Sequence, residues 1–320
     1  MLLIAVDEAG YGPKLGPLVV AASVWRIPDA LNRAECFEPL RKPVVVGNAK
    51  LVVDDSKKLF HTRNANSLAS LQTVVEVCQH WCGLPQESFP RWLRRVASED
   101  YHDLTETVWL QRITLSSTVE SSDAARAIQI WKAAGADLID LRCRIVTAKR
   151  FNSAIAAGQN KSDLLSRLSI GLVRSVLADF VNERKVDVFF DRHGGRRFYG
   201  GVLQHGFDDA VLSVEEETKQ HSSYQLKWPD DLGSPGRTMR VHFTVKGDSF
   251  VPVALSSIHA KCLREVCMKS FNDYFCRHAV EGESLKPTAG YPVDADRFLG
   301  EAAGLIERLG IETTDLVRCR

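Results

Sequence analysis

Residues 2–12, LLIAVDEAGYG, decide how the chain begins to fold. Residues 2–6 form a continuous apolar run, which is typical of a strand that is buried on both faces. Two acids, Asp7 and Glu8, end that run, and two glycines follow shortly after them. A second apolar run at residues 18–25 comes after a turn rich in glycine and proline. We expect two buried strands joined as a long hairpin, with the acids at a strand end.

The rest of the chain alternates between strand-like and helix-like patterns. Further strands are expected at residues 138–146, 186–191, 210–214 and 240–245, and helices at 163–180, 253–278 and 294–309. Helices and strands in this order predict an α/β fold with a mixed central sheet flanked by helices. We expect one domain over residues 1–320, with a mostly helical insertion at about 62–135 and a C-terminal helical part at about 253–320.

Composition and charge exclude several classes of protein. Hydrophobic residues make up 45% and charged residues 25%, with a net charge of +1, which excludes a disordered chain. The first apolar run stops at Asp7, too short for a signal peptide, and no stretch is long enough for a membrane span. We expect a cytoplasmic monomer that does not contact membranes.

The eight cysteines include one pair with a nearby histidine, Cys78 and Cys82 with His80 between them. Two cysteines at this spacing could bind zinc, but no second cluster completes a tetrahedral site. We interpret them as small apolar residues on one helix face. Scattered cysteines also suit a reducing compartment.

Acids stand at several strand ends and helix positions of the predicted fold. Asp7 and Glu8 end the first strand, Asp191 ends the strand at 186–191, and Glu265 lies in a helix. Strand ends that carry functional groups converge at one edge of an open sheet. Convergent carboxylates bind Mg²⁺, and a pair of such ions can hydrolyse a phosphodiester. Taken singly, each acid could equally be a turn former or a member of a solvated ion pair.

One physical difficulty concerns Asp7 and Glu8. Neighbouring residues of a regular strand point to opposite faces, so the two carboxylates cannot share a metal pair there. We therefore expect the first strand to end or distort between them. Gly10 and Gly12 give the chain the freedom to do so and to bring backbone amides close to a ligand.

Six segments in order resemble the prokaryotic type 2 ribonucleases H, with some features of type 3. They are residues 6–13 (VDEAGYGP), 16–22 (GPLVVAA), 55–59 (DSKKL), Asp191 after its strand, 246–265 (with KGD and SIHAKCLRE) and 290–292 (GYP). The resemblance covers nearly the whole chain. It implies a ribonuclease H-like fold and an endonuclease that cuts RNA paired with DNA, or ribonucleotides embedded in duplex DNA.

The resemblance also implies roles for individual residues. Asp7, Glu8, Asp191 and Glu265 would hold Mg²⁺ or Mn²⁺ and carry out catalysis. Gly10, Tyr11 and Gly12 would lie against the ribose, whose 2′-hydroxyl distinguishes RNA from DNA. Tyr291 would pack on the neighbouring sugar, and Ser56 with Lys57 would contact phosphate.

The chain departs from the related ribonucleases at two of these positions. Tyr11 stands where they carry Arg or Lys, and Glu265 replaces the Asp that is usual in type 2 but resembles the Glu of type 3. These departures leave two alternatives open. One is a diverged nucleic-acid-binding module without turnover, although four retained carboxylates argue against it. The other is a resolvase-like or transposase-like nuclease that acts on DNA.

Overall fold

The computed structural model describes residues 1–29, 33–47, 49–54, 66–83, 89–115, 119–229, 236–280 and 285–319, with the side chains of all except 66 and 67. Among these residues, no helix is both long enough and apolar enough to cross a membrane.

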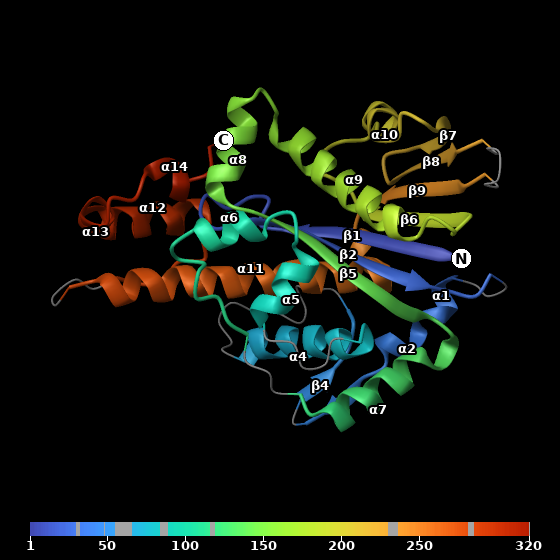
Figure 1. Cartoon of the computed structure of the whole chain (residues 1–320), viewed down its shortest axis with the longest axis horizontal. Coiled ribbons are helices and arrows are strands. Elements are labelled where there is room, and N and C mark those ends of the chain that lie inside the picture. Colours follow the sequence, from blue (N-terminus) through green and yellow to red (C-terminus); the bar gives the residue numbers. More distant parts are fainter. Residues whose placement is uncertain are drawn as a thin grey trace.

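A seven-stranded sheet in the order β5-β2-β1-β6-β9-β8-β7 forms the centre of the molecule (Figure 1). Its strands are β1 (Leu2–Ala9), β2 (Leu18–Arg26), β5 (Asp137–Val146), β6 (Lys185–Asp191), β7 (Val211–Glu217), β8 (His221–Lys227) and β9 (Thr238–Thr244). β1 pairs antiparallel with β2 and parallel with β6, and β6 pairs parallel with β9. The sheet is therefore mixed, which confirms the predicted α/β class and the hairpin of the first two strands.

Helices cover both faces of this sheet and form the parts that project from it. They are α1 (Arg33–Cys36), α2 (Glu38–Arg41), α4 (Asn66–Trp81), α5 (Phe89–Val96), α6 (Tyr101–Glu106), α7 (Ser121–Trp131), α8 (Ala148–Ala156), α9 (Lys161–Asp179), α10 (Gly200–Gly206), α11 (Val251–His278), α12 (Pro292–Glu301), α13 (Ala303–Arg308) and α14 (Thr313–Leu316). A small hairpin, β3 (Val44–Val46) and β4 (Ala49–Leu51), and the single turns η1 (Lys132–Ala134) and η2 (Gly247–Ser249) complete the structure.

Alternate residues of β1 pack against opposite helical layers. Leu2, Ile4 and Val6 join the core under α9, whereas Leu3 and Ala5 join the core that contains α11. Figure 1 shows α9 and α11 on opposite sides of the sheet, with α4 and α7 beyond α11 on its side. We refer to these two sides as the α9 face and the α11 face.

Two differences from the sequence prediction concern the central sheet and the C-terminal helices. β8 was not expected. Ser222 is buried in this strand at a position where an apolar residue is usual, so the alternation of apolar and polar residues is weak. The single helix expected at residues 294–309 is instead two helices that meet at Ala302. Gly304 lies at the start of the second helix, and glycine stabilises a helix less than other residues do.

Candidate active site

Asp7 and Asp191 lie side by side at the C-terminal edge of the parallel strands. β1 and β6 pair in parallel with Val6 opposite Phe190, and the two acids are the next residue of each strand. Register partners on adjacent strands project their side chains from the same face. That face is the α11 face, because Ala5 joins the core of α11. The structure therefore brings together two of the predicted site residues.

Asp248 adds a carboxylate to this edge. It lies in η2, just past the end of β9, which is the next strand after β6. The backbone amide of Gly247 donates a hydrogen bond of 2.7 Å to Oδ1 of Asp191. A Cβ atom at Gly247 would lie 2.9 Å from the Cα of Asp191, so the close approach requires glycine. The sequence prediction of the acidic group omitted Asp248, although a Gly-Asp pair directly after an apolar strand is a signal for it.

The electrostatics of Asp7 show that the acids act on one another. Asp7 is 7% exposed, and burial together with the charge of Asp191 raises its pKa to about 7, with a smaller effect from Asp248. Hydrogen bonds from the Ser257 hydroxyl and from the Glu8 amide, the latter 2.7 Å long, oppose this rise. Carboxylates that resist ionisation in this way are stabilised by a nearby cation.

Glu8 lies at the same edge but on the opposite face. The expected break between Asp7 and Glu8 is wrong, since β1 stays paired with β2 through Ala9 and Glu8 stands opposite Val20. The alternation of the strand then directs Glu8 to the α9 face. Its charge acts there on Tyr11, whose pKa is raised by burial and by Glu8.

Glu265 lies away from the pair formed by Asp7 and Asp191. It follows Ser257, which hydrogen-bonds Asp7, by eight residues of α11, or about 12 Å along the helix axis. Its Oε1 instead pairs with the guanidinium of Arg264 at 2.8 Å. The structure thus gives Asp248, rather than Glu265, a place beside the two strand-end acids.

The glycine loop after β1 packs closely on Arg264. Gly10 has a φ of +85°, and a Cβ atom there would lie 2.5 Å from the carbonyl oxygen of Pro17 and 2.9 Å from Arg264 Cδ. Arg264 is buried, and its Nη2 donates to the carbonyl of Ala289 at 2.7 Å. Its guanidinium also lies 5.7 Å from the centre of the Tyr291 ring. One arginine therefore joins the loop at Gly10 to the segment that carries Tyr291.

The segment at Gly290 reaches this loop through its backbone as well. The Gly290 carbonyl accepts hydrogen bonds from the amides of Lys14 and Leu15 at 2.8 and 3.1 Å. Tyr291 follows it and is 54% exposed, while Gly12 is exposed on the loop. These contacts bring the loop that carries Gly10 and Gly12 next to the segment that carries Tyr291. Ser56 and Lys57, also predicted to bind substrate, lie outside the described residues.

The carboxylates of Asp7 and Asp191 suit a divalent cation that keeps part of its water shell. Within the described part of the chain, no group of three or more His, Cys, Asp or Glu side chains forms a ready metal cage. Asp7 and Asp191 nevertheless form a pair of adjacent carboxylates, and burial together with the charge of Asp191 raises the pKa of Asp7. Mg²⁺ keeps several waters and is usually held by one or two carboxylates plus substrate phosphate. The residues present fit such a partly hydrated ion.

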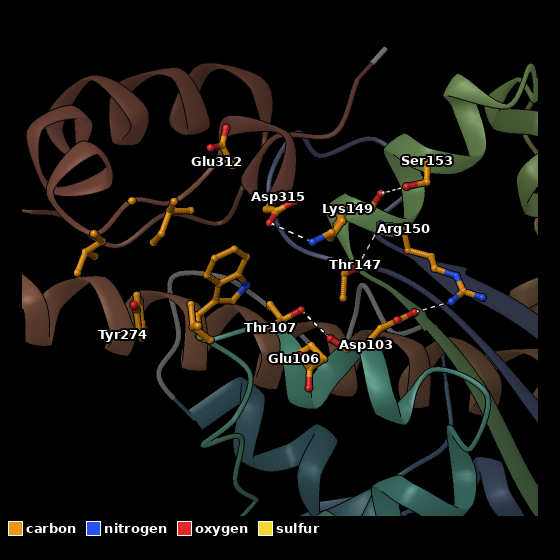
Figure 2. A pocket seen from close by; sticks show the side chains of 15 residues that line it. Asp103, Glu106, Thr107, Thr147, Lys149, Arg150, Ser153, Tyr274, Glu312 and Asp315 are labelled. Carbon is orange, nitrogen blue, oxygen red and sulfur yellow. Dashed lines mark hydrogen bonds and ion pairs between the residues drawn. The ribbon is translucent and has the colours of Figure 1, made fainter.

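A separate cavity of 490 Å³ lies among α6, α8, α11 and α14 (Figure 2). Figure 2 shows Lys149 directed toward Asp315 and Arg150 toward Asp103, and these pairs are 3.7 and 2.8 Å long. The strand-end acids do not line this cavity. Its two cations are each paired with an acid of the lining, and we place the candidate active site at the sheet edge, where the strand-end acids lie.

Comparisons with known proteins give likenesses of structure. No protein-family model matches the sequence, and no curated protein is significantly similar to it. The ribonuclease HII of a PCNA:RNase HII complex from Archaeoglobus fulgidus is 14% identical, with a TM-score of 0.42 over 100% of this chain and 95% of that chain. Ribonuclease H2 from Pyrococcus horikoshii is 14% identical, with a TM-score of 0.45 over 99% of this chain and 92% of that chain. Bst-RNase HIII in complex with Mn²⁺ is 12% identical, with a TM-score of 0.41 over 99% of this chain and 66% of that chain. All three TM-scores are low, so the function proposed below depends on the residues of the site.

Proposed function

We propose that the chain is a metal-dependent ribonuclease H that hydrolyses the RNA strand of RNA–DNA hybrids or ribonucleotides embedded in duplex DNA. The observation that carries the proposal is the placement of Asp7 and Asp191 on one face of one sheet edge, with Asp248 beside them. The glycine loop at Gly10 follows directly from the same strand. Six ordered sequence segments that resemble type 2 and type 3 ribonucleases H support it.

The chain's own residues would prepare the site for Mg²⁺ or Mn²⁺. Asp7 and Asp191 would hold the ion, while the Ser257 hydroxyl and the Gly247 amide fix the orientation of these two carboxylates. Asp248 adds negative charge that favours a cation at the same place. When bound, divalent ions of this kind activate water and stabilise the leaving oxygen of a phosphodiester.

The loop and the Tyr291 segment would recognise the ribonucleotide. Gly10 and Gly12 allow the backbone to approach a sugar closely, and backbone groups can sense the 2′-hydroxyl that DNA lacks. Tyr291 offers an exposed ring against a neighbouring sugar. Ser56 and Lys57 are proposed to position the phosphate backbone, a contact that carries no sequence information.

A cleavage assay with matched duplexes tests this function. We expect cutting of a continuous RNA–DNA hybrid, of a DNA duplex with one embedded ribonucleotide, or of both, in Mg²⁺ or Mn²⁺ and not in EDTA. Asp7→Asn, Asp191→Asn and Asp248→Asn should each reduce cleavage on the order of a hundredfold or more while the protein stays folded. Glu265→Gln is the variant with which these losses of cleavage are compared. Cleavage by Glu8→Gln shows whether an acid on the α9 face takes part in catalysis.

Two results would contradict the proposal. Equal cleavage of an all-DNA duplex would assign the chain to the DNA nucleases. Binding of hybrid without any cleavage in either metal would identify a nucleic-acid-binding module that has lost turnover.

A further inference from the structure

The segment that follows α14, residues 317–319, pairs with the loop between β1 and β2. Its first residue forms an isolated antiparallel bridge with Leu15, and the Arg318 amide donates to the Lys14 carbonyl at 2.9 Å. The same loop has a second partner, because the amides of Lys14 and Leu15 donate to the Gly290 carbonyl. Two segments that are distant in sequence therefore hold the loop.

The side chain of Arg318 extends this pairing to the residue next to Gly12. Its Nη2 donates a hydrogen bond to the carbonyl of Pro13, which follows Gly12 directly. The guanidinium carbon lies 5.2 Å from the centre of the Phe151 ring of α8, and Arg318 is 2% exposed. The arginine thus holds the loop from inside the protein, one residue from the glycine that is proposed to approach the ribose.

Asn152 of α8 holds the segment that carries Arg318. Its Nδ2 donates to the carbonyls of Thr314 and Val317, each at 2.7 Å, and its Oδ1 accepts from the Cys319 amide at 2.8 Å. These bonds lie on both sides of Arg318 in the sequence. The arginine is therefore anchored to α8 and not only to the loop that it contacts.

The charge of Arg318 is buried without a carboxylate beside it. Within the described part of the chain, Arg318 forms no ion pair, and its Nε and Nη1 have no hydrogen-bond acceptor. Burial and the positive charge of Arg264 lower its pKa to about 9, which leaves it protonated at neutral pH. Buried donors without acceptors and an unpaired buried charge both destabilise a fold. Packing alone therefore does not account for an arginine at this position.

We propose that Arg318 is a positioning residue that holds the backbone at Gly12 where it can contact the ribonucleotide. Its two hydrogen bonds fix the carbonyl groups of Pro13 and Lys14, which are the next two along the chain. This inference rests on the proposed function, because it takes the backbone at Gly12 as the part that senses the 2′-hydroxyl. The guanidinium is buried, so it acts through the loop and does not touch the substrate.

Hydrogen exchange measures the placement of the loop without any cleavage. Arg318→Met removes the charge and all side-chain donors, whereas Arg318→Lys retains a charge and donors. The amides of residues 14 and 15 should exchange several-fold faster in Arg318→Met and closer to the native rate in Arg318→Lys. Arg237→Met is the matched control. Arg237 likewise donates to backbone carbonyls, but it lies just before β9, at the end of the sheet opposite to the acids.

Cleavage kinetics separate a positioning role from a purely structural one. Arg318→Met should lower kcat/KM on a continuous RNA–DNA hybrid on the order of tenfold, because small displacements of a contacting group are costly. Its Tm should stay within a few degrees of native, since the loss of an unpaired buried charge offsets the lost hydrogen bond. Arg318→Lys should recover part of kcat/KM. Arg237→Met should lower the Tm and keep the native kcat/KM.

Either of two results overturns the role of Arg318. Native exchange at residues 14 and 15 in Arg318→Met would mean that the loop does not depend on the guanidinium. Faster exchange together with native kcat/KM would mean that the arginine serves only the fold. Asn152→Ala, which releases the segment that carries Arg318, should produce both effects in smaller measure, and it decides the question if Arg318→Met does not fold.

The outcomes also distinguish this inference from the proposed function. A native protein that binds hybrid but cleaves nothing removes the proposed function. The loop exchange, and whether Arg318→Met weakens hybrid binding in EDTA, then still decide the role of Arg318. A native protein that cleaves hybrid while Arg318→Met keeps native exchange and native kcat/KM retains the function and removes the positioning role. A native protein that binds no duplex overturns both.

Discussion

Asp7 is a buried carboxylate next to a second one, and its pKa of about 7 makes the stability of the protein depend on pH. Its folded-state pKa lies above its value in the unfolded chain, so the folded state binds the proton more tightly. The free energy of unfolding therefore falls as pH rises from about 4 to about 7. Asp7→Asn removes this effect, and we expect it to stabilise the metal-free protein at pH 8, on the order of a few kcal/mol, but much less at pH 5.

Thermal unfolding at both pH values, with and without Mg²⁺ or Mn²⁺, measures this stabilisation of Asp7→Asn. The metal should raise the Tm of the native protein at pH 8 and leave that of Asp7→Asn unchanged, since a ligand stabilises only the state that binds it. Asp208→Asn, at an exposed position, is the control. A Tm for Asp7→Asn that is equal to or lower than native at pH 8 would contradict the raised pKa of Asp7 that burial and the charge of Asp191 produce.

Individual residues also show how far the sequence could predict the site. The apolar strands that end in acids predicted that Asp7 and Asp191 lie close together, because the carboxyl ends of such strands lie at one edge of an open sheet. The choice between Asp248 and Glu265 needed the structure. Which acid approaches Asp7 depends on how η2 turns against β6 and on where α11 begins, and neither is encoded in local periodicity.

At the scale of the element, the loop between β1 and β2 has two glycines with different requirements. Gly10 adopts a left-handed φ against Pro17 and Arg264, whereas a Cβ atom at Gly12 would meet nothing within 4 Å. Gly10→Ala should therefore destabilise the protein by about 2–4 kcal/mol. Gly12→Ala should change the free energy of unfolding by less than about 0.5 kcal/mol.

The same pair of variants separates folding from recognition. If the backbone at Gly12 approaches the ribose, Gly12→Ala should lower kcat/KM on hybrid on the order of tenfold although its denaturation curve is native. Urea unfolding and cleavage kinetics measure the two effects. Native activity in Gly12→Ala would place the sugar elsewhere, and native stability in Gly10→Ala would contradict the packing on Arg264.

Elements were predictable where their pattern was strong. The two strands of the first hairpin have uninterrupted apolar runs, and the helix at 253–278 differs from α11 only at its start. The regular course of β1 through Glu8 was not predicted, because glycines only permit a distortion and do not impose one. In the structure, pairing with β2 continues to Ala9 and keeps the strand extended.

At the scale of the whole molecule, the helices between β4 and β5 share one core with the sheet. Trp25 of β2 meets Trp81 of α4 at 5.6 Å between ring centres, and Trp81 stacks on Trp131 of α7 at 6.1 Å. The Trp81 indole also donates to Asp137, the first residue of β5, at 2.8 Å. Helices that contribute side chains to the core of the sheet in this way should unfold together with it.

Asp100 links this helical part to the edge strand β5, and substituting it tests whether the helices and the sheet unfold together. It is 1% exposed and accepts hydrogen bonds of 2.8 and 3.0 Å from Arg144 and of 2.8 Å from the Ile145 amide. Asp100→Ala leaves an edge-strand amide unpaired and leaves Arg144 with only its ion pair to the exposed Glu99, and we expect a loss of about 3–5 kcal/mol. Asp103→Ala, which breaks the more exposed pair with Arg150, should cost about 1 kcal/mol or less.

Denaturant unfolding followed by two probes distinguishes a shared core from a separable helical part. Tryptophan fluorescence reports on Trp81, Trp92 and Trp131 of the helices between β4 and β5, together with Trp25, Trp109 and Trp228, and far-UV circular dichroism reports on the whole chain. We expect both signals of Asp100→Ala to shift together to lower denaturant in a single transition. Fluorescence that changes well before circular dichroism would mean that the helices between β4 and β5 detach from an intact sheet. Asp100 would then hold two independent units together rather than complete one.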